Sequence, residues 1–340
     1  MAISFDDINN RYSEALEVDL RRAISIITSP LCRMMEYQLG WCDDNGSPIE
    51  HATGIRIHAL LCLTVAEGIS GKYMPSLPAA SSVELVDNFS AIHSDIQSGS
   101  PTRGSRSTVW WIWGPAQAIN AGDGLHALAR LSLLRLINTD QAPAQIFSSI
   151  QKLDEACLGL VQGQYMDISY EDFIDIKPDA YLKMAQEKRG SLLACAAALG
   201  VLGSTDDPNT LEAFYKFGQI LGMASQLRDD IVTTWGESRH AKAAPEILNK
   251  RKGFPVIYAM DKLEGAPKRL LNNIYFQRAL RPEDKVKIVE ILDSLEVKQI
   301  CQDMASGLGR QAIETINRLG VVSSMGMERL RAMVNFMVIS

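Results

Sequence analysis

Apolar residues recur at intervals of three and four along most of this chain, and this spacing constrains the fold more than any other feature. In the segment from Glu84 to Leu125, for example, Leu85, Phe89 and Ile92 follow the spacing, so one helix face is expected to be buried there. No segment shows the sustained alternation of apolar and polar residues, bounded by turns, that is typical of β-strands. The pattern therefore predicts an all-α protein.

Apolar periodicity, together with proline starts and glycine stops, predicts where the helices lie. Asp207 followed by Pro208 is a strong start signal, because it places an acidic N-cap before a proline at the first helical position. We find no fixed-period repeat and no Pro/Gly-rich linker, so residues 1–340 are predicted to form a single helical domain. Helices are expected over residues 7–41, 52–69, 80–98, 112–137, 143–167, 177–202, 208–235, 242–261, 283–298, 299–318 and 325–338.

Composition narrows the class of protein. The formal net charge of −6 and the lack of a long basic run argue against a nucleic-acid partner. The N-terminal residues show no signal-peptide pattern, and the longest apolar run, Leu192–Leu202, is too short to cross a bilayer. The six cysteines form no CxxC pair, so reduced thiols and a cytoplasmic location are expected.

A first group of polar residues lies on the helix predicted over residues 80–98. Helical spacing places Asp87, Ser94, Asp95 and Ser98 near one another, and the turn-forming sequence GSPTRGS then places Arg103 just beyond the helix end. A carboxylate and an arginine are thus brought to one point. Taken alone, the pattern also fits a solvated helix end beside a basic loop.

A second group closes the helix predicted over residues 208–235. Gln226, Asp229, Asp230 and Thr233 are spaced i, i+3, i+4 and i+7, so they share a face. Adjacent carboxylates on a mostly apolar helix are costly unless they are paired, hydrated or bound to a metal. Their hard oxygen atoms suit Mg²⁺, which completes its shell with water and phosphate oxygens.

Basic residues elsewhere in the chain offer contacts for a phosphate. Lys188 lies in a polar break ahead of an apolar helix, and Arg251 and Lys252 lie in the sequence ILNKRKGFPVIYAM. Taken singly, each is also consistent with a solvated side chain. Together with the acidic groups, they point to a metal-dependent phosphate site.

The order of these motifs resembles that of the trans-isoprenyl diphosphate synthases (polyprenyl synthetases) and their terpene-synthase relatives. A first segment, GIRIHALLCLTVAEGISG, resembles the GKRLRPLL…AEALGG helix of that family. A second, IHSDIQSGSPTRGSRSTVW, resembles its first aspartate-rich motif, IHDDIxDxSxxRRGxPTxH. INAGDGL, GQYMDISYE, the Lys188 segment and QLRDDIVTTWG then follow in the family order, the last resembling the second aspartate-rich motif.

The resemblance implies an isoprenoid-synthase bundle around a deep apolar cavity. It also implies Mg²⁺ as cofactor, a C10–C20 allylic prenyl diphosphate as substrate, and a homodimer. The catalytic residues it implies are Asp95, Asp229, Asp230 and Lys188, and the three aspartates among them are the metal ligands. The diphosphate-binding residues it implies are Arg103, Lys188, Gln226, Arg251 and Lys252.

The chain departs from the family pattern where an isopentenyl diphosphate is normally held. Ile55, His58, Asp87 and Gly104 stand where the family has two cationic residues, a His or Gln, and the second Arg of RRG. Because Asp87 would repel a diphosphate, these changes predict that isopentenyl diphosphate is not used. General decay of an inactive paralogue is the alternative interpretation.

Both aspartate-rich motifs also contain fewer carboxylates than the family pattern has. Ser94 and Ser98 replace the outer carboxylates of the first motif, and Thr233 replaces the last carboxylate of the second. Hydroxyl groups are weaker Mg²⁺ ligands than carboxylates, so full metal occupancy is not expected. Asp229 with Asp230 is the best-supported metal position.

These departures favour a non-elongating terpene synthase in which the allylic cation cyclises or loses a proton. A second hypothesis is prenyl transfer to a non-isopentenyl acceptor, with Asp87 and His58 orienting or deprotonating it. A third is a non-catalytic subunit that forms a heterodimer with an active homologue. Residues expected to line the cavity or the acceptor site are Phe89, Asp87, His58, Tyr165 and Gln164.

Overall fold

The computed structural model describes residues 3–49, 54–173, 175–236, 251–277 and 280–339. Helices account for nearly all of its regular structure. They are α1 (Phe5–Ile24), α2 (Pro30–Gln38), α3 (Ile57–Ser70), α4 (Leu77–Gln97), α5 (Val109–Trp113), α6 (Pro115–Leu134), α7 (Pro143–Ser169), α8 (Pro178–Ala185), α9 (Ser191–Leu202), α10 (Pro208–Trp235), α11 (Phe254–Lys262), α12 (Gly265–Phe276), α13 (Pro282–Ser294), α14 (Val297–Asn317) and α15 (Ser324–Val338). The short turns η1 (Met74–Ser76), η2 (Arg135–Asn138) and η3 (Gln186–Gly190) adjoin these helices, and η3 is π-helical.

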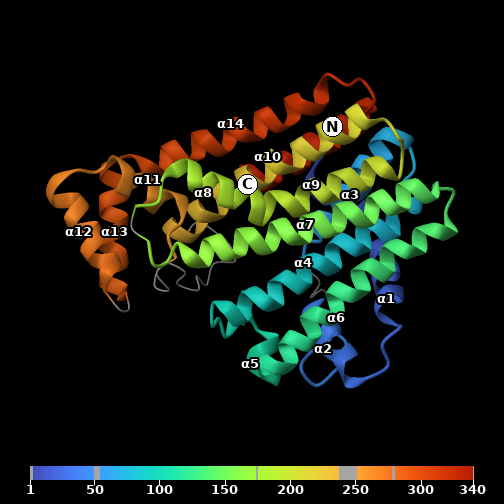
Figure 1. The fold of residues 1–340 in the computed structure, drawn as a ribbon, viewed down its shortest axis with the longest axis horizontal. Helices are drawn as coiled ribbons and strands as arrows, with labels where there is room; N and C mark the ends of the chain where they lie inside the picture. Colours follow the sequence, from blue (N-terminus) through green and yellow to red (C-terminus); the bar gives the residue numbers. More distant parts are fainter. Residues whose placement is uncertain (1–2, 50–53, 174, 237–250, 278–279, 340) are drawn as a thin grey trace.

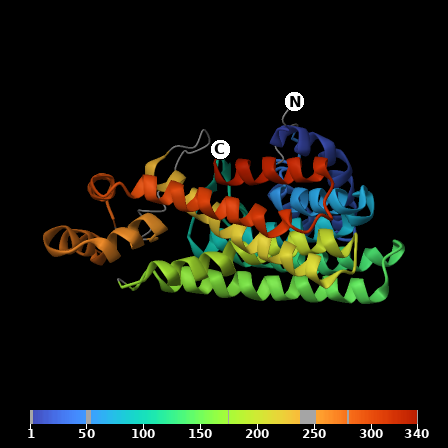
Figure 2. The ribbon, with the colours of Figure 1, turned by 90° about the horizontal axis from the view of Figure 1, so that it is seen from above.

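The long helices lie alongside one another in a bundle, and α9 occupies its interior (Figure 1). Helices α3, α4, α7 and α10 all pack against α9, although they come from widely separated parts of the chain. Figure 2 shows α12 and α13 projecting from one end of this bundle, beside α11. The core is therefore built from helices along the whole sequence, around a central helix.

Helix α9 has no polar face. Every residue from Ser191 to Leu202 is buried, because neighbouring helices surround it on all sides. A helix that is apolar all round must be enclosed, either by protein or by lipid. Within the described residues, no helix combines the length and the apolar character needed to cross a membrane.

The prediction of an all-α fold is confirmed, with one small addition. Strands β1 (Thr102–Arg103) and β2 (Arg106–Ser107) form a two-residue antiparallel ribbon in the loop after α4. Gly104 forms its turn with a φ of 60°, a conformation that other residues rarely adopt. All six cysteines carry free thiols, in agreement with the expectation from their spacing.

Two predicted helices are in fact interrupted. The helix predicted over residues 7–41 is wrong as a single unit, because α1 ends at Ile24 and α2 begins at Pro30. Proline lacks a backbone N–H and favours the first turn of a helix, so it starts α2 and cannot extend α1. The helix predicted over residues 112–137 is likewise broken at Gly114, whose φ of 82° separates α5 from α6.

Other boundaries also shift. Residues 177–202 form α8, the π-helical turn η3 and α9 rather than one regular helix. The helix predicted over residues 242–261 begins at Phe254, and its residues 242–250 lie outside the described part. In place of the helix predicted over residues 52–69, the structure has α3, which begins at Ile57. Helix α12 was not predicted, since the sequence GAPKRLLNNIYF contains Gly, Pro and Asn, which are weak helix formers.

Glycines bring α10 into direct backbone contact with α9 and η3. A Cβ atom on Gly218 would lie 2.4 Å from the Cα of Ala194, and one on Gly222 would lie 2.3 Å from the Cα of Gly190. Both distances are far shorter than a van der Waals contact. These positions therefore require glycine for close packing rather than for an unusual φ.

We predict that Gly218→Ala lowers the free energy of unfolding by about 1–3 kcal/mol, because the added methyl group overpacks a rigid backbone contact. Urea denaturation measures the change. Gly307→Ala on α14 is the matched control, since its Cβ would meet only the Arg310 side chain, at 3.9 Å. The control should gain about 0.5–1 kcal/mol from helix propensity. Equal stability of the two variants would contradict the packing argument.

Candidate functional site

An open cavity of about 540 Å³ lies between the C-terminal end of α4 and the C-terminal half of α10. Helices α3, α7 and α9, the turn η3 and the β1 strand also contribute to its wall. Predicted site residues and their neighbours that line it are His58, Asp87, Ser94, Asp95, Ser98, Arg103, Gly104, Gln164, Lys188, Arg189, Gln226, Asp229, Asp230, Thr233 and Arg251. The fold thus brings the two aspartate-containing motifs together from helices that are more than a hundred residues apart in sequence.

At the end of α4, Asp95 is paired with Arg103. The guanidinium donates from Nη2 to Asp95 Oδ1 at 2.7 Å and from Nε to Oδ2 at 3.2 Å. Asp95 is only 5% exposed, whereas about half of the Arg103 side chain is exposed. Burial raises the pKa of Asp95 above its usual value, and the guanidinium opposes this rise only in part. The one remaining carboxylate of the first motif is therefore engaged by an arginine.

On α10, Asp229 is paired with Arg189. The two side chains are both partly exposed to the cavity. The charge of Asp229 raises the pKa of Arg189 above its usual value. Sequence reasoning missed Arg189, although it directly follows Lys188, because nothing local shows that the π-helical turn brings it to α10.

Asp230 has different surroundings from Asp229. It is buried and accepts hydrogen bonds from Tyr181 Oη at 2.5 Å, Gln226 Nε2 at 2.9 Å and the backbone N–H of Phe254 at 2.9 Å. Burial raises the pKa of Asp230 to about 6. These contacts join α8, α10 and α11, so Asp230 fixes the position of these elements. The sequence grouped Asp229 and Asp230 together, but their roles in this structure differ. Asp229 pairs with Arg189 at the cavity, whereas Asp230 holds three helices together.

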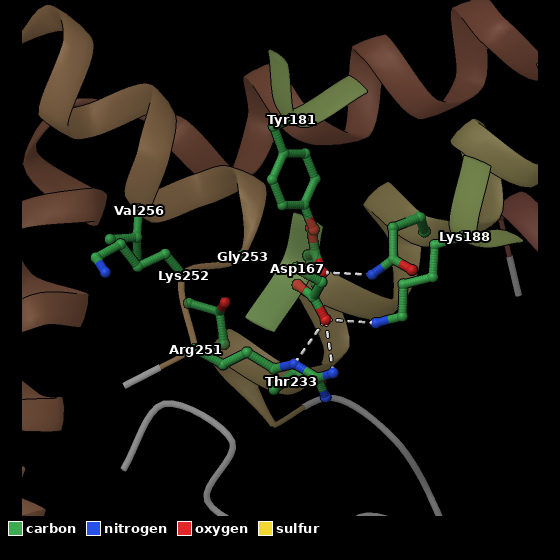
Figure 3. Close-up of a pocket in the computed structure, with 11 residues that line it drawn as sticks. Asp167, Tyr181, Lys188, Thr233, Arg251, Lys252, Gly253 and Val256 are labelled. Atoms are coloured by element: carbon green, nitrogen blue, oxygen red, sulfur yellow. Dashed lines mark hydrogen bonds and ion pairs between the residues drawn. The ribbon is translucent and has the colours of Figure 1, made fainter. Parts of the chain in front are cut away.

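A buried carboxylate on α7, Asp167, gathers two of the predicted diphosphate ligands (Figure 3). Lys188 Nζ lies 2.7 Å from Asp167 Oδ2, and Arg251 contacts the same oxygen through Nε at 2.9 Å and Nη2 at 2.6 Å. Burial acts to raise the pKa of Asp167, but the two cations hold it below its usual value. Burial also lowers the pKa of Lys188. Asp167 lies within the GQYMDISYE motif, which was the available signal for it.

Lys252 is directed mainly toward the backbone. Its Nζ donates to the carbonyl oxygens of Tyr170 at 2.9 Å and Glu171 at 2.7 Å, just beyond the end of α7. The ammonium group also lies 5.4 Å from the ring centroid of Tyr275. These contacts anchor the segment before α11 to α7, and Lys252 lines a smaller cavity of about 40 Å³ that is shown in Figure 3.

Another part of the cavity wall carries His58 and Asp87. His58 Nδ1 lies 3.5 Å from Asp87 Oδ1. Burial acts to raise the pKa of Asp87, but His58, Arg189 and Arg103 together hold it below its usual value. Ile55, on the same segment as His58, is exposed. This wall therefore presents a carboxylate to the cavity.

Two residues expected to line the cavity do not do so. Phe89 is buried between the rings of His93 and His126, with both centroids 4.8 Å from its own. Tyr165 is 72% exposed on the outer face of α7, because it lies one residue from the inward-facing Gln164 on a helix. Gln164 lines the cavity as predicted.

Comparison with known proteins assigns the chain to a protein family. Residues 41–292 match the family model described as "Polyprenyl synthetase". The chain therefore belongs to the polyprenyl synthetase family.

Individual relatives agree with this assignment. The geranylgeranyl diphosphate synthase of Mycobacterium tuberculosis is 34% identical over 289 residues, which covers 84% of this chain and 81% of that protein. A (2E,6E)-farnesyl diphosphate synthase of Mycobacterium bovis is 31% identical over 259 residues, covering 76% and 71%. Among solved structures, a polyprenyl synthetase from Streptomyces coelicolor has a TM-score of 0.88 and 29% identity, covering 97% of this chain and 98% of that one.

We predict that Asp167→Asn lowers the free energy of unfolding by about 3–5 kcal/mol, because Lys188 and Arg251 lose the buried charge that they share. Urea denaturation measures the loss. Asp261→Asn is the control, since its ion pair with Lys177, at 3.3 Å, lies at the surface and should contribute little. A stability of Asp167→Asn equal to that of the control would show that the cluster does not hold α7 against η3.

Proposed function

We propose that this protein is a class I isoprenoid enzyme that binds a C10–C20 allylic prenyl diphosphate with Mg²⁺ and releases its diphosphate. Membership of the polyprenyl synthetase family supports an enzyme of the prenyltransferase kind, since the relatives carry names of prenyl diphosphate synthases. The finer proposal is that the chain does not extend its substrate with isopentenyl diphosphate. The charges around the cavity support each part.

Two ion pairs supply matched groups for a metal-bound diphosphate. Arg103 with Asp95 and Arg189 with Asp229 each combine a guanidinium with a carboxylate on the wall of the cavity. Guanidinium groups bind phosphate oxygens through charge-assisted hydrogen bonds, and carboxylates bind Mg²⁺. A Mg²⁺-bound diphosphate would therefore provide each member of both pairs with a new partner of opposite charge.

The donor atoms on this wall fit Mg²⁺. Asp95 and Asp229 offer carboxylate oxygens, and Ser94, Ser98 and Thr233 offer hydroxyl oxygens on the same cavity. Mg²⁺ takes oxygen ligands and keeps several waters, so few protein ligands suffice. When bound, the ion stabilises the negative charge that develops on the departing diphosphate. The hydroxyl groups in place of carboxylates favour fewer ions than an intact motif would hold.

Lys188 and Arg251 extend the phosphate-binding wall. Both cations contact the carboxylate of Asp167 beside α10. Both residues line the cavity. A diphosphate held there gains electrostatic stabilisation in a partly desolvated place.

The observation that carries the non-elongating part is Asp87 on the cavity wall. Its low pKa keeps the carboxylate ionised, and it faces the cavity beside His58. A second diphosphate placed against this wall would be repelled, and neither Ile55 nor Gly104 supplies a cation. The relatives named above are chain-elongating synthases by name, so similarity alone favours elongation and these residues favour its loss.

Cyclisation or proton loss of the allylic cation is then the favoured outcome, as in a terpene synthase. Prenyl transfer to a non-isopentenyl acceptor is the second candidate, because His58 and Asp87 line the cavity and can accept a proton. A non-catalytic role beside an active homologue is the third, supported by Ser94 and Ser98 in the first motif.

We predict diphosphate release from at least one C10–C20 allylic diphosphate in the presence of Mg²⁺, with products that do not change when isopentenyl diphosphate is added. Pyrophosphate detection and mass spectrometry of the extracted products measure both. Hydrocarbon or alcohol products would support a terpene synthase. Elongated products would contradict the argument from Asp87.

Within the same assay, Asp229→Ala should reduce the rate of diphosphate release by at least about 10²-fold, since it removes charge stabilisation at the reacting group. Asp303→Ala, at an exposed position on α14, is the control and should retain full activity. Full activity of Asp229→Ala would show that the second motif holds no catalytic metal.

An apolar surface on α6 and α7 supports a dimer. Helices α6 and α7 pack together, and large apolar side chains remain exposed on them. They include Leu131, Leu134, Phe147, Leu158, Val161 and Tyr165. Exposed apolar groups of this extent are typical of protein interfaces. We propose a homodimer through this surface, and a heterodimer with an active homologue would use the same one.

The dimer predicts that Leu158→Asp with Val161→Asp yields a monomer, because two charges would be buried at the interface without partners. Light scattering after size-exclusion chromatography measures the mass. Val286→Asp, at an equally exposed apolar position on α13, should leave the dimer intact. A monomeric native protein would refute the proposal.

Two further proposals concern organisation and location. We propose that residues 1–340 act as one domain, since the predicted site draws on helices from α3 to α10. The free thiols of the six cysteines support a cytoplasmic location.

A further inference from the structure

Three potential metal-ligating side chains meet beside the cavity, where α3 packs against α4. One ligand atom from each of His58 on α3 and Glu84 and Asp87 on α4 lies within 4.8 Å of the other two. Over the described part of the chain, no other group of three His, Cys, Asp or Glu residues comes this close. His58 is 6% exposed and Glu84 is 2% exposed, whereas Asp87 is open to the cavity.

Two buried polar atoms in this group have no hydrogen-bond partner among the described residues. They are Nδ1 of His58 and Oε2 of Glu84. The distance of 3.5 Å from His58 Nδ1 to Asp87 Oδ1 is too long for a good hydrogen bond. Buried polar atoms are nearly always partnered in native proteins, since an unpaired one is costly. The arrangement is therefore incomplete as it stands.

Among the described residues, only one guanidinium lies within 4 Å of the carboxylates of this group. Arg56 lies 3.4 Å from Glu84 Oε1, but its Nε donates to Glu17 Oε1 at 3.0 Å and its Nη2 to the carbonyl of Leu39 at 2.7 Å. One guanidinium thus serves two carboxylates, while Asp87 adds a third negative charge nearby. A dication bound here would add positive charge beside these carboxylates.

We propose that His58, Glu84 and Asp87 bind a divalent transition-metal ion of the Zn²⁺ type. An imidazole nitrogen with two carboxylate oxygens is a donor set typical of Zn²⁺ and its neighbours, whereas Mg²⁺ prefers oxygen alone. Ligands about 2.0–2.1 Å from a tetrahedral ion lie roughly 3.3 Å apart. The observed 3.5 Å between His58 Nδ1 and Asp87 Oδ1 is close to that value.

Such a site would remain open on the cavity side. Three protein ligands leave a coordination position for water or for an oxygen atom of a bound molecule. Asp87 and His58 line the cavity, so that position would face the cavity. The inference concerns the ion alone and does not depend on the proposed reaction.

Equilibrium dialysis of the metal-free, full-length protein against Zn²⁺, with Mg²⁺ in excess, tests the proposal. We expect one bound equivalent of Zn²⁺ and a tetrahedral absorption spectrum with Co²⁺. His58→Ala and Asp87→Asn should each weaken binding by at least about tenfold, since even the groups that support a ligand contribute that much. Because Asp87 is open to the cavity, Asp87→Asn should fold even if His58→Ala does not.

Two control variants show where the ion binds. His93→Ala removes a comparable pair on α4 and α6, in which His93 Nε2 lies 3.7 Å from Asp123 Oδ1, and it should keep the Zn²⁺. Asp229→Asn alters the second aspartate motif and should also keep it. Absence of binding to the native protein would overturn the proposal. Unchanged binding by Asp87→Asn, or loss of binding by Asp229→Asn, would overturn it as well.

Discussion

The backbone contact between α10 and the α9–η3 segment is the constraint on which the rest of the structure depends. Gly190, Gly218 and Gly222 let the backbones of these two segments approach more closely than any side chain would permit. Helix α10, together with α3, α4 and α7, encloses α9, and its contact with η3 sets the distance between η3 and α10. Arg189 therefore reaches Asp229, and the site inherits its geometry from the packing of the core.

The charges of the cavity are already paired within the protein. Buried or half-buried ions are costly when alone, and each arginine on the motif wall has an aspartate beside it. Such pairs keep the side chains in place before a ligand arrives. A ligand that brings both a metal and a diphosphate can replace both partners at once. A ligand with only one of the two would leave a charge uncompensated, so this arrangement favours metal and diphosphate binding together.

Side chains of both charges line the cavity. Lys188 and Arg189 lie on η3, Arg103 lies on β1 and Arg251 lies before α11, whereas Asp87 lines the cavity beside His58. The proposal of a bound diphosphate depends on the basic residues, and the proposal of a metal ion beside His58 depends on Asp87 and the buried Glu84.

Local sequence signals were sufficient to predict much of the fold and part of the candidate site. The spacing of apolar residues gave the all-α class, and the Asp207–Pro208 signal placed α10 correctly over residues 208–235. Helical spacing also grouped Gln226, Asp229 and Thr233 on one helix face, and all three line the cavity. These features depend on neighbours within one or two turns, which a single segment contains.

The tertiary structure determines which side chains pair with one another. The π-helical turn, the pairing of Arg189 with Asp229, and the sharing of Asp167 by Lys188 and Arg251 join elements that are distant along the chain. It also turned Tyr165 outward. The periodicity of the sequence predicts which residues share a helix face. Only the packing of the helices determines which other residues that face contacts. Ion pairs and metal geometry depend on these contacts between helices, so the sequence named several cavity residues but missed Arg189 and could not give the ion pairs.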